Sequence, residues 1–90
     1  MADRQSYRLR YKQPAARDIK KLSPQVRKRL GAKLAFFADQ PDPLRFAQRL
    51  TKPADAQWRF RVGNYRVLFD VEGRDLVVLH VQHRREAYRK

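Results

Sequence analysis

The stretch WRFRVGNYRVLF, residues 58–69, decides the fold because it predicts a β-hairpin. Two runs rich in aromatic and β-branched residues flank Gly63-Asn64, a pair suited to a two-residue turn. A turn of that length sets the register of the two strands. The predicted opposed pairs are Val62 with Tyr65, Arg61 with Arg66, Phe60 with Val67, and Arg59 with Leu68.

Three arginines share one face of this hairpin. Side chains alternate between the faces of a strand, so Arg59, Arg61 and Arg66 lie together, and the apolar opposite face is suited to pack under helices. Like charges across a hairpin are destabilising, but three close guanidiniums make a strong phosphate-binding site. The alternative is a solvated face on which these arginines pair with nearby acids: Asp55, Asp70 and Glu72.

Upstream of the hairpin, the sequence predicts a strand and two helices. Residues 7–11 alternate apolar and polar side chains and indicate a strand. Residues 15–22 are helical in composition, and Pro14 suits the first turn of that helix. Ser23-Pro24 marks the start of a second helix, which runs to about Asp39 and stops before the prolines at 41 and 43.

The remaining segments complete an α+β fold. Residues 44–56 are interpreted as a connector of loop with at most one helical turn. The hairpin strands cover 57–63 and 65–71, a turn lies at 72–74, and an apolar strand covers 75–82 before a short tail of helical character. The order β-α-α-β-β-β predicts one domain, residues 1–90. It has an N-terminal strand, a helical hairpin and a three-strand antiparallel meander, with the helices on one face of the sheet.

The charge balance limits the class of partner. The chain carries 22 Lys plus Arg against 9 Asp plus Glu, a net charge of +13, spread as +7 over residues 1–44 and +6 over residues 45–90. Such a field favours nucleic acid, an acidic protein or an anionic membrane surface, with simple solubility as the alternative.

Other functional classes are excluded by composition. The chain has no cysteine, which excludes disulfides and Cys-based metal sites. No apolar run approaches the roughly 18 residues of a transmembrane helix, and the N-terminus lacks the apolar core of a signal peptide. We therefore expect a soluble, cytoplasmic protein that does not bind membranes.

The C-terminal segment HVQHRREAYRK, residues 80–90, adds further functional side chains. It brings His83, Arg84, Arg85 and Tyr88 to the end of the sheet, where imidazole, guanidinium and phenol suit proton transfer, charge stabilisation and base stacking in phosphodiester chemistry. The alternatives are an exposed histidine at a strand end and a tyrosine that only covers the sheet edge. His80 lies inside an apolar run and is interpreted as structural. Two histidines three apart, without a carboxylate pattern, predict no metal site, and no cofactor is expected.

The chain resembles the RelE/ParE superfamily of bacterial and archaeal toxins from toxin–antitoxin systems, and within it the RelE-like ribonuclease branch. The resemblance covers about residues 6–90 and is carried by RFRVGNYRVLFDV (59–71), by HVQHRREAY (80–88) and by the opening YRLRYKQPAARDIKKLSPQVRKRL. It implies a curved antiparallel sheet and an endoribonuclease that cuts mRNA, commonly in the ribosomal A site, without a metal. The 2′-hydroxyl attacks the adjacent phosphate, and basic residues stabilise the charged transition state.

The resemblance also implies residue roles. Arg59 and Arg61 fall where the best-known members carry two lysines, and Arg66 matches the arginine of the Tyr-Arg motif. A lysine can act as a base after desolvation, whereas a guanidinium keeps its proton near neutral pH. His83 is therefore the candidate base or acid, since imidazole titrates near neutrality. The expected catalytic residues are Arg61, Arg66, His83, Arg84 and Tyr88. The expected RNA-binding residues are Arg59, Arg61, Arg66 and Arg85.

The expected partners also follow from the resemblance. It implies a partly acidic antitoxin that lays an extended or helical segment over the basic surface in a hetero-oligomer, with mRNA and the ribosome as further partners. Two alternatives stay open: a ParE-like gyrase inhibitor on the same fold, and a degenerate toxin that only binds antitoxin or RNA. The closing His-Arg and Tyr88 favour the ribonuclease branch, since the gyrase-poisoning branch typically lacks that set.

Overall fold

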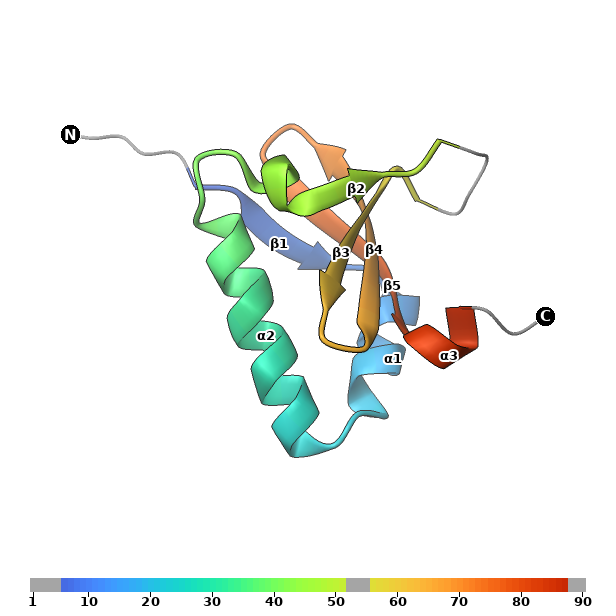
Figure 1. Cartoon of the computed structure of the whole chain (residues 1–90). Coiled ribbons are helices and arrows are strands. Elements are labelled where there is room, and N and C mark those ends of the chain that lie inside the picture. Colours follow the sequence, from blue (N-terminus) through green and yellow to red (C-terminus); the bar gives the residue numbers. More distant parts are fainter. Residues whose placement is uncertain (1–5, 52–55, 88–90) are drawn as a thin grey trace.

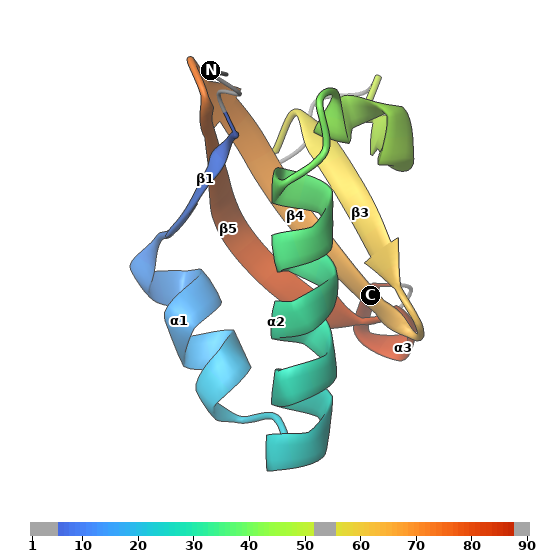
Figure 2. The ribbon, with the colours of Figure 1, turned by 90° about the vertical axis from the view of Figure 1, so that its left-hand side faces the viewer.

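The described residues, 6–51 and 56–87, build one mixed five-stranded sheet with two helices on one of its faces, as the computed structural model shows (Figures 1 and 2). The elements in chain order are β1 (Arg8–Tyr11), α1 (Gln13–Lys20), α2 (Pro24–Ala38), the 3₁₀ turn η1 (Pro43–Phe46), β2 (Ala47–Arg49), β3 (Trp58–Val62), β4 (Tyr65–Glu72), β5 (Asp75–His83) and α3 (Arg84–Ala87). No described helix combines the length and the apolar character needed to cross a membrane.

The sheet has the strand order β1-β5-β4-β3-β2. β1 runs parallel to β5, and the other neighbouring strands are antiparallel, so the sheet is mixed where the resemblance implied an antiparallel one. The predicted α+β fold is confirmed: a first strand, a helical hairpin, and the meander β3-β4-β5. The helical tail is also present, as α3.

The interpretation of residues 44–56 as loop was wrong at one point. The expected helical turn is η1, but Ala47–Arg49 form β2, an edge strand antiparallel to β3. A three-residue strand without a β-branched or aromatic residue leaves no periodicity to detect. β2 exists because the outer edge of β3 offers it hydrogen-bonding partners, which is a tertiary effect.

The helices cover the sheet through a narrow apolar stripe. The Val26 N–H donates to Ser23 Oγ at 3.3 Å, which caps α2 at the predicted residue. Leu30, Leu34 and Phe37 are buried on one side of α2, because residues spaced three or four apart share a face of a helix. Below them the fully buried Phe60 lies between two rings, with its centroid 4.4 Å from that of Phe37 and 4.3 Å from that of Phe69.

The hairpin has the predicted register in all four pairs. Gly63 adopts φ +58°, whereas no described non-glycine residue has a positive φ, and Asn64 is among these. A positive φ at only the first turn position is the type II′ pattern, which matches the twist of the flanking strands. The turn therefore places Arg61 directly opposite Arg66.

A β-bulge interrupts the pairing of β4 with β5. Leu68 is opposite His80 and Phe69 is opposite Val78, which leaves Leu79 as an extra residue in β5. An extra residue reverses the alternation of every later side chain in that strand. Val81 is thereby buried beneath the helices, while His80 and Gln82 lie on the other face.

Candidate functional site

The arginines lie on the outer face of the sheet, by which we mean the face turned away from α1 and α2. Strand pairing orders the side chains of this face in two rows across the strands. The row nearer the hairpin turn consists of Gln82, Arg66 and Arg61. The next row consists of His80, Leu68, Arg59 and Gln48. The structure thus brings together the three hairpin arginines as the alternation predicted.

The side chain of Arg59 contacts the edge strand β2. Its Nη2 donates a hydrogen bond to Gln48 Oε1 on β2, directly across the sheet. Arg59 is half-buried, which fits a guanidinium that packs along neighbouring side chains. Sequence reasoning missed Gln48 because it missed β2.

A polar cavity of about 300 Å³ lies at the turn end of the outer face. Its lining includes three guanidinium groups, because Arg84 from the C-terminal segment joins the cross-strand pair. The remaining lining comes from the turn and the start of β4. The lining residues are Arg61, Gly63, Asn64, Tyr65, Arg66 and Arg84. Planar guanidinium forks around one small cavity suit an oxyanion such as a phosphate.

Arg84 reaches this cavity because its backbone is tied to the hairpin turn. Its N–H donates to the carbonyl oxygen of Asn64 at 2.6 Å. A second cavity, of about 740 Å³, adjoins this contact and is lined by Asn64, His83, Arg84 and Arg85. The two cavities share Asn64 and Arg84, so they adjoin at the end of the sheet.

His83 lies on the opposite face from the arginine pair. It is opposite Tyr65, and their rings meet edge to face with centroids 5.0 Å apart. Its Nδ1 accepts a hydrogen bond from the Arg85 N–H at 3.1 Å. His83 therefore lines the second cavity from the helix side of the sheet and does not lie beside Arg61 and Arg66. Tyr88, the last predicted site residue, lies outside the described residues.

The nearby acids that were considered as partners for the hairpin arginines have other contacts. The Gln57 N–H donates to Asp70 Oδ1 at 2.8 Å, and Glu72 lies 3.8 Å from Arg10. Asp55 lies outside the described residues.

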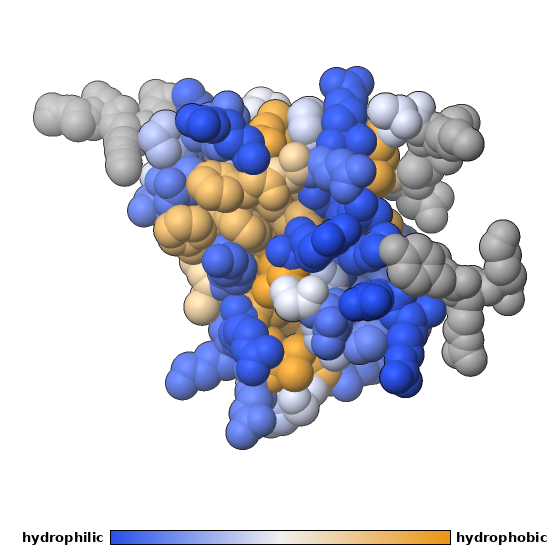
Figure 3. Space-filling view, in the orientation of Figure 1, coloured by the Kyte–Doolittle hydropathy of each residue, from blue (hydrophilic) through white to orange (hydrophobic). Residues whose placement is uncertain are grey.

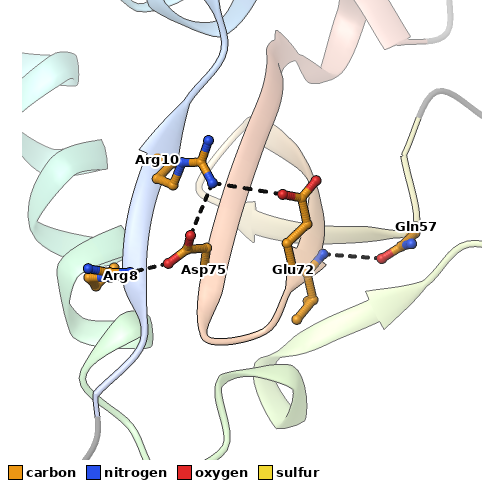
Figure 4. A network of polar contacts seen from close by, with 6 residues as sticks. Arg8, Arg10, Gln57, Glu72 and Asp75 are labelled. Carbon is orange, nitrogen blue, oxygen red and sulfur yellow. Dashed lines mark hydrogen bonds and ion pairs between the residues drawn. The ribbon is translucent and has the colours of Figure 1, made fainter.

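Glu72 belongs to an ion-pair network that joins β1, β4 and β5 (Figure 4). Its centre is Asp75, whose side chain is 14% exposed and lies 3.0 Å from Arg10 and 3.2 Å from Arg8. The hydrogen bond from Arg10 is the main cause that lowers the pKa of Asp75 below its ordinary value.

The face of the molecule seen in Figure 3 has a hydrophilic and an apolar area. Hydrophilic side chains gather over β3 and β4, whereas an apolar area covers the upper part of α2 and η1. The apolar area includes the exposed rings of Phe36 and Phe46, whose centroids are 5.9 Å apart. Among the described residues, no group of three His, Cys, Asp or Glu is placed to hold a metal ion.

Comparisons with known proteins identify the family. Residues 9–88 match the family of the ParE toxin of type II toxin–antitoxin systems, parDE. Toxin RelG of Mycobacterium tuberculosis is 35% identical over 88 residues, which are 93% of this chain and 98% of RelG. The chain therefore belongs to the RelE/ParE superfamily of toxins from type II toxin–antitoxin systems, as the sequence motifs indicated.

Solved structures agree with this assignment. The crystal structure of the toxin–antitoxin complex RelBE2 from Mycobacterium tuberculosis contains a chain that matches with a TM-score of 0.70 and 28% identity, covering 88% of this chain and 99% of that one. A chain of the intact E. coli RelBE toxin–antitoxin complex matches with a TM-score of 0.66 and 23% identity, covering 87% and 96%. The second likeness shows the fold alone.

Proposed function

We propose that this toxin is an endoribonuclease that cleaves mRNA, in the ribosomal A site, by attack of a 2′-hydroxyl on the adjacent phosphate. The observation that carries this proposal is the convergence of Arg61, Arg66 and Arg84 on one cavity at the end of the sheet. A phosphodiester gains negative charge as the 2′-oxygen attacks. Preorganised cationic donors stabilise that charge without reorganisation during the reaction.

The arginines supply charge stabilisation and not proton transfer. In the reaction the O2′–P bond forms, the P–O5′ bond breaks, and the products are a 2′,3′-cyclic phosphate and a 5′-hydroxyl. Guanidiniums keep their protons near neutral pH, so Arg61, Arg66 and Arg84 bind the non-bridging oxygens. Arg59 and Arg85 lie on either side of these residues and suit contacts to flanking phosphates, which position the strand.

His83 is proposed as a hydrogen-bond donor at the edge of this site. Because Nδ1 accepts from the Arg85 N–H, the neutral ring carries its proton on Nε2. That tautomer donates a hydrogen bond and does not act as a base. Full cleavage by His83→Ala would exclude a role for the ring in the reaction. Tyr88 is proposed to orient the RNA, on the sequence resemblance alone.

Primer extension on ribosome-bound mRNA tests the proposed function. The wild-type protein is expected to produce discrete cuts in the A-site codon, and Arg66→Ala is expected to abolish them while remaining folded. Arg27→Ala removes the same charge from the exposed surface of α2 and serves as the matched control. Intact mRNA with folded wild-type protein contradicts the proposal.

Gyrase inhibition is the second candidate function, favoured by the match to the ParE toxin family. The two activities have different targets, so a supercoiling assay with purified gyrase separates them. Loss of supercoiling with intact mRNA would establish the gyrase inhibitor. A protein that does neither, yet binds antitoxin or RNA, is a degenerate toxin.

We also propose that a partly acidic antitoxin covers the basic outer face. The basis is the net charge of +13, and the likeness to toxin chains solved in toxin–antitoxin complexes. If ion pairs dominate this complex, raising the salt concentration weakens it, because exposed charges are screened. An affinity independent of salt would assign the binding energy to apolar contacts instead.

A further inference from the structure

The position of His80 is set by the bulge at Leu79. Without the extra residue, alternation along β5 from Leu76 and Val78 would direct His80 into the apolar layer under the helices. With it, His80 lies on the outer face opposite Leu68, in the same row as Arg59. Bulges are over-represented next to active sites, where they redirect a side chain.

His80 is oriented by a carboxylate from α1. Asp18 Oδ2 lies 3.6 Å from His80 Nδ1 and also accepts the Val81 N–H at 2.9 Å. That backbone contact fixes the carboxylate at the free edge of β5, beyond the end of β1. Within the described residues, Asp18 is the polar partner of the His80 ring. The His80 side chain is 37% exposed.

This contact determines which ring nitrogen can accept a proton. A carboxylate beside Nδ1 favours the tautomer with the proton on Nδ1, which leaves the lone pair on Nε2. His83 has the opposite arrangement, because its Nδ1 is an acceptor. Of the two histidines, His80 has the tautomer of a base.

The neighbours of His80 on the outer face suit an RNA strand. Arg66 is its diagonal neighbour across β4, at the spacing of about 7–8 Å within reach of long side chains. Leu68 separates His80 from Arg59 and offers an apolar surface between them. The charged groups that the register places around His80 are thus Asp18 from α1, Arg66 and Asp70 on either side of Leu68 in β4, and Arg59 beyond Leu68.

We propose that His80 is the general base of the cleavage reaction and that Asp18 is its positioning residue, an inference that rests on the proposed ribonuclease function. His80 Nε2 takes the proton of the 2′-hydroxyl as O2′ attacks phosphorus. The P–O5′ bond then breaks, and the leaving 5′-oxygen takes a proton from water. Asp18 holds the ring and stabilises the imidazolium that forms.

The test is the rate of A-site cleavage as a function of pH, over about pH 5.5 to 8.5, where an imidazole titrates. The wild-type rate is expected to rise with pH to a plateau, because the base must be unprotonated. His80→Gln is expected to reduce the plateau by about 100-fold or more and to abolish the rise. Unfolding temperatures confirm that the variant is folded.

Asp18→Asn isolates the charge of the carboxylate, because the asparagine oxygen still accepts the Val81 N–H. We expect kcat to fall while KM stays near the wild-type value, because Asp18 acts on the reaction through the His80 ring and is not expected to contact RNA. Asp39→Asn removes an equal charge at the end of α2 and is the control.

The outcomes separate the inference from the proposed function. A wild-type protein that leaves mRNA intact contradicts both. Cleavage by His80→Gln at the wild-type rate, or a reduced rate with an unchanged pH profile, overturns the assignment of His80 and leaves the ribonuclease intact. Loss of the rise in His80→Gln, with a lower kcat at unchanged KM in Asp18→Asn, supports the base and its positioning residue.

Discussion

The pair of arginines across the hairpin predicts that removing one of the two charges stabilises the fold. Arg61 and Arg66 are directly opposite each other on the outer face. Like charges at such positions are destabilising by about 0.2–1 kcal/mol. Arg61→Gln keeps a long polar side chain and removes one charge. We therefore expect the free energy of unfolding to rise by about 0.5 kcal/mol, which for a domain of this size raises Tm by about 2–4 °C.

The same variant is expected to lose activity. Arg61 lines the cavity assigned to the phosphate, and a hydrogen bond to a charged group contributes about 1.5–3 kcal/mol. At about 1.4 kcal/mol per tenfold change, cleavage should fall roughly 10- to 150-fold. Higher stability with lower activity is the signature of charges gathered for a ligand.

Thermal unfolding at low and high salt checks the physical cause. Screening shortens the range of the repulsion to about 3 Å at 1 M salt, so the difference in Tm should disappear there. Arg27→Gln on the exposed surface of α2 is the control for net charge. A lower Tm for Arg61→Gln at low salt, or a rise that persists at high salt, would refute the repulsion argument.

Three further predictions concern the scaffold. The pKa of Asp75 is lowered chiefly by Arg10, so its ion pairs stabilise the fold above the ordinary value of 3.8 and this stabilisation is lost as pH falls through the lowered pKa. The Tm difference between wild type and Asp75→Asn should therefore vanish in acid, and a constant difference would contradict the assignment. Phe60→Ala removes a fully buried ring that packs between two others and should cost about 3–5 kcal/mol in denaturant unfolding. A cost under about 1 kcal/mol would mean that the core repacks. Gly63→Ala forces a side chain into φ +58° and should cost about 1–2 kcal/mol, with no steric clash to add to it. An unchanged Tm would show that the turn has relaxed.

The two histidines show that the placement of a site residue depends on non-local as well as local structure. His83 follows an apolar strand and was the candidate for proton transfer from its place in the sequence, whereas His80 was interpreted as structural. The bulge exchanges their faces relative to simple alternation from the start of β5, and Asp18, which is distant in sequence, then lies beside His80 Nδ1. No sequence pattern around either histidine predicts the bulge.

By itself, the sequence determined the parts of this toxin that depend on neighbours along the chain. A two-residue turn and strict alternation gave the hairpin register, and with it the shared face of Arg59, Arg61 and Arg66. Capping residues and 3.6-residue spacing placed α2 and its buried stripe. These features follow from backbone geometry within a few residues.

Only the tertiary structure decided the contacts between distant segments. The parallel pairing of β1 with β5, the short strand β2 against β3, and the reach of Arg84 to the hairpin turn each join residues far apart in sequence. Such contacts form because an unpaired strand edge or backbone group must find a partner when it leaves water. Which partner it finds depends on the packing of the whole chain, and local preference leaves that choice open.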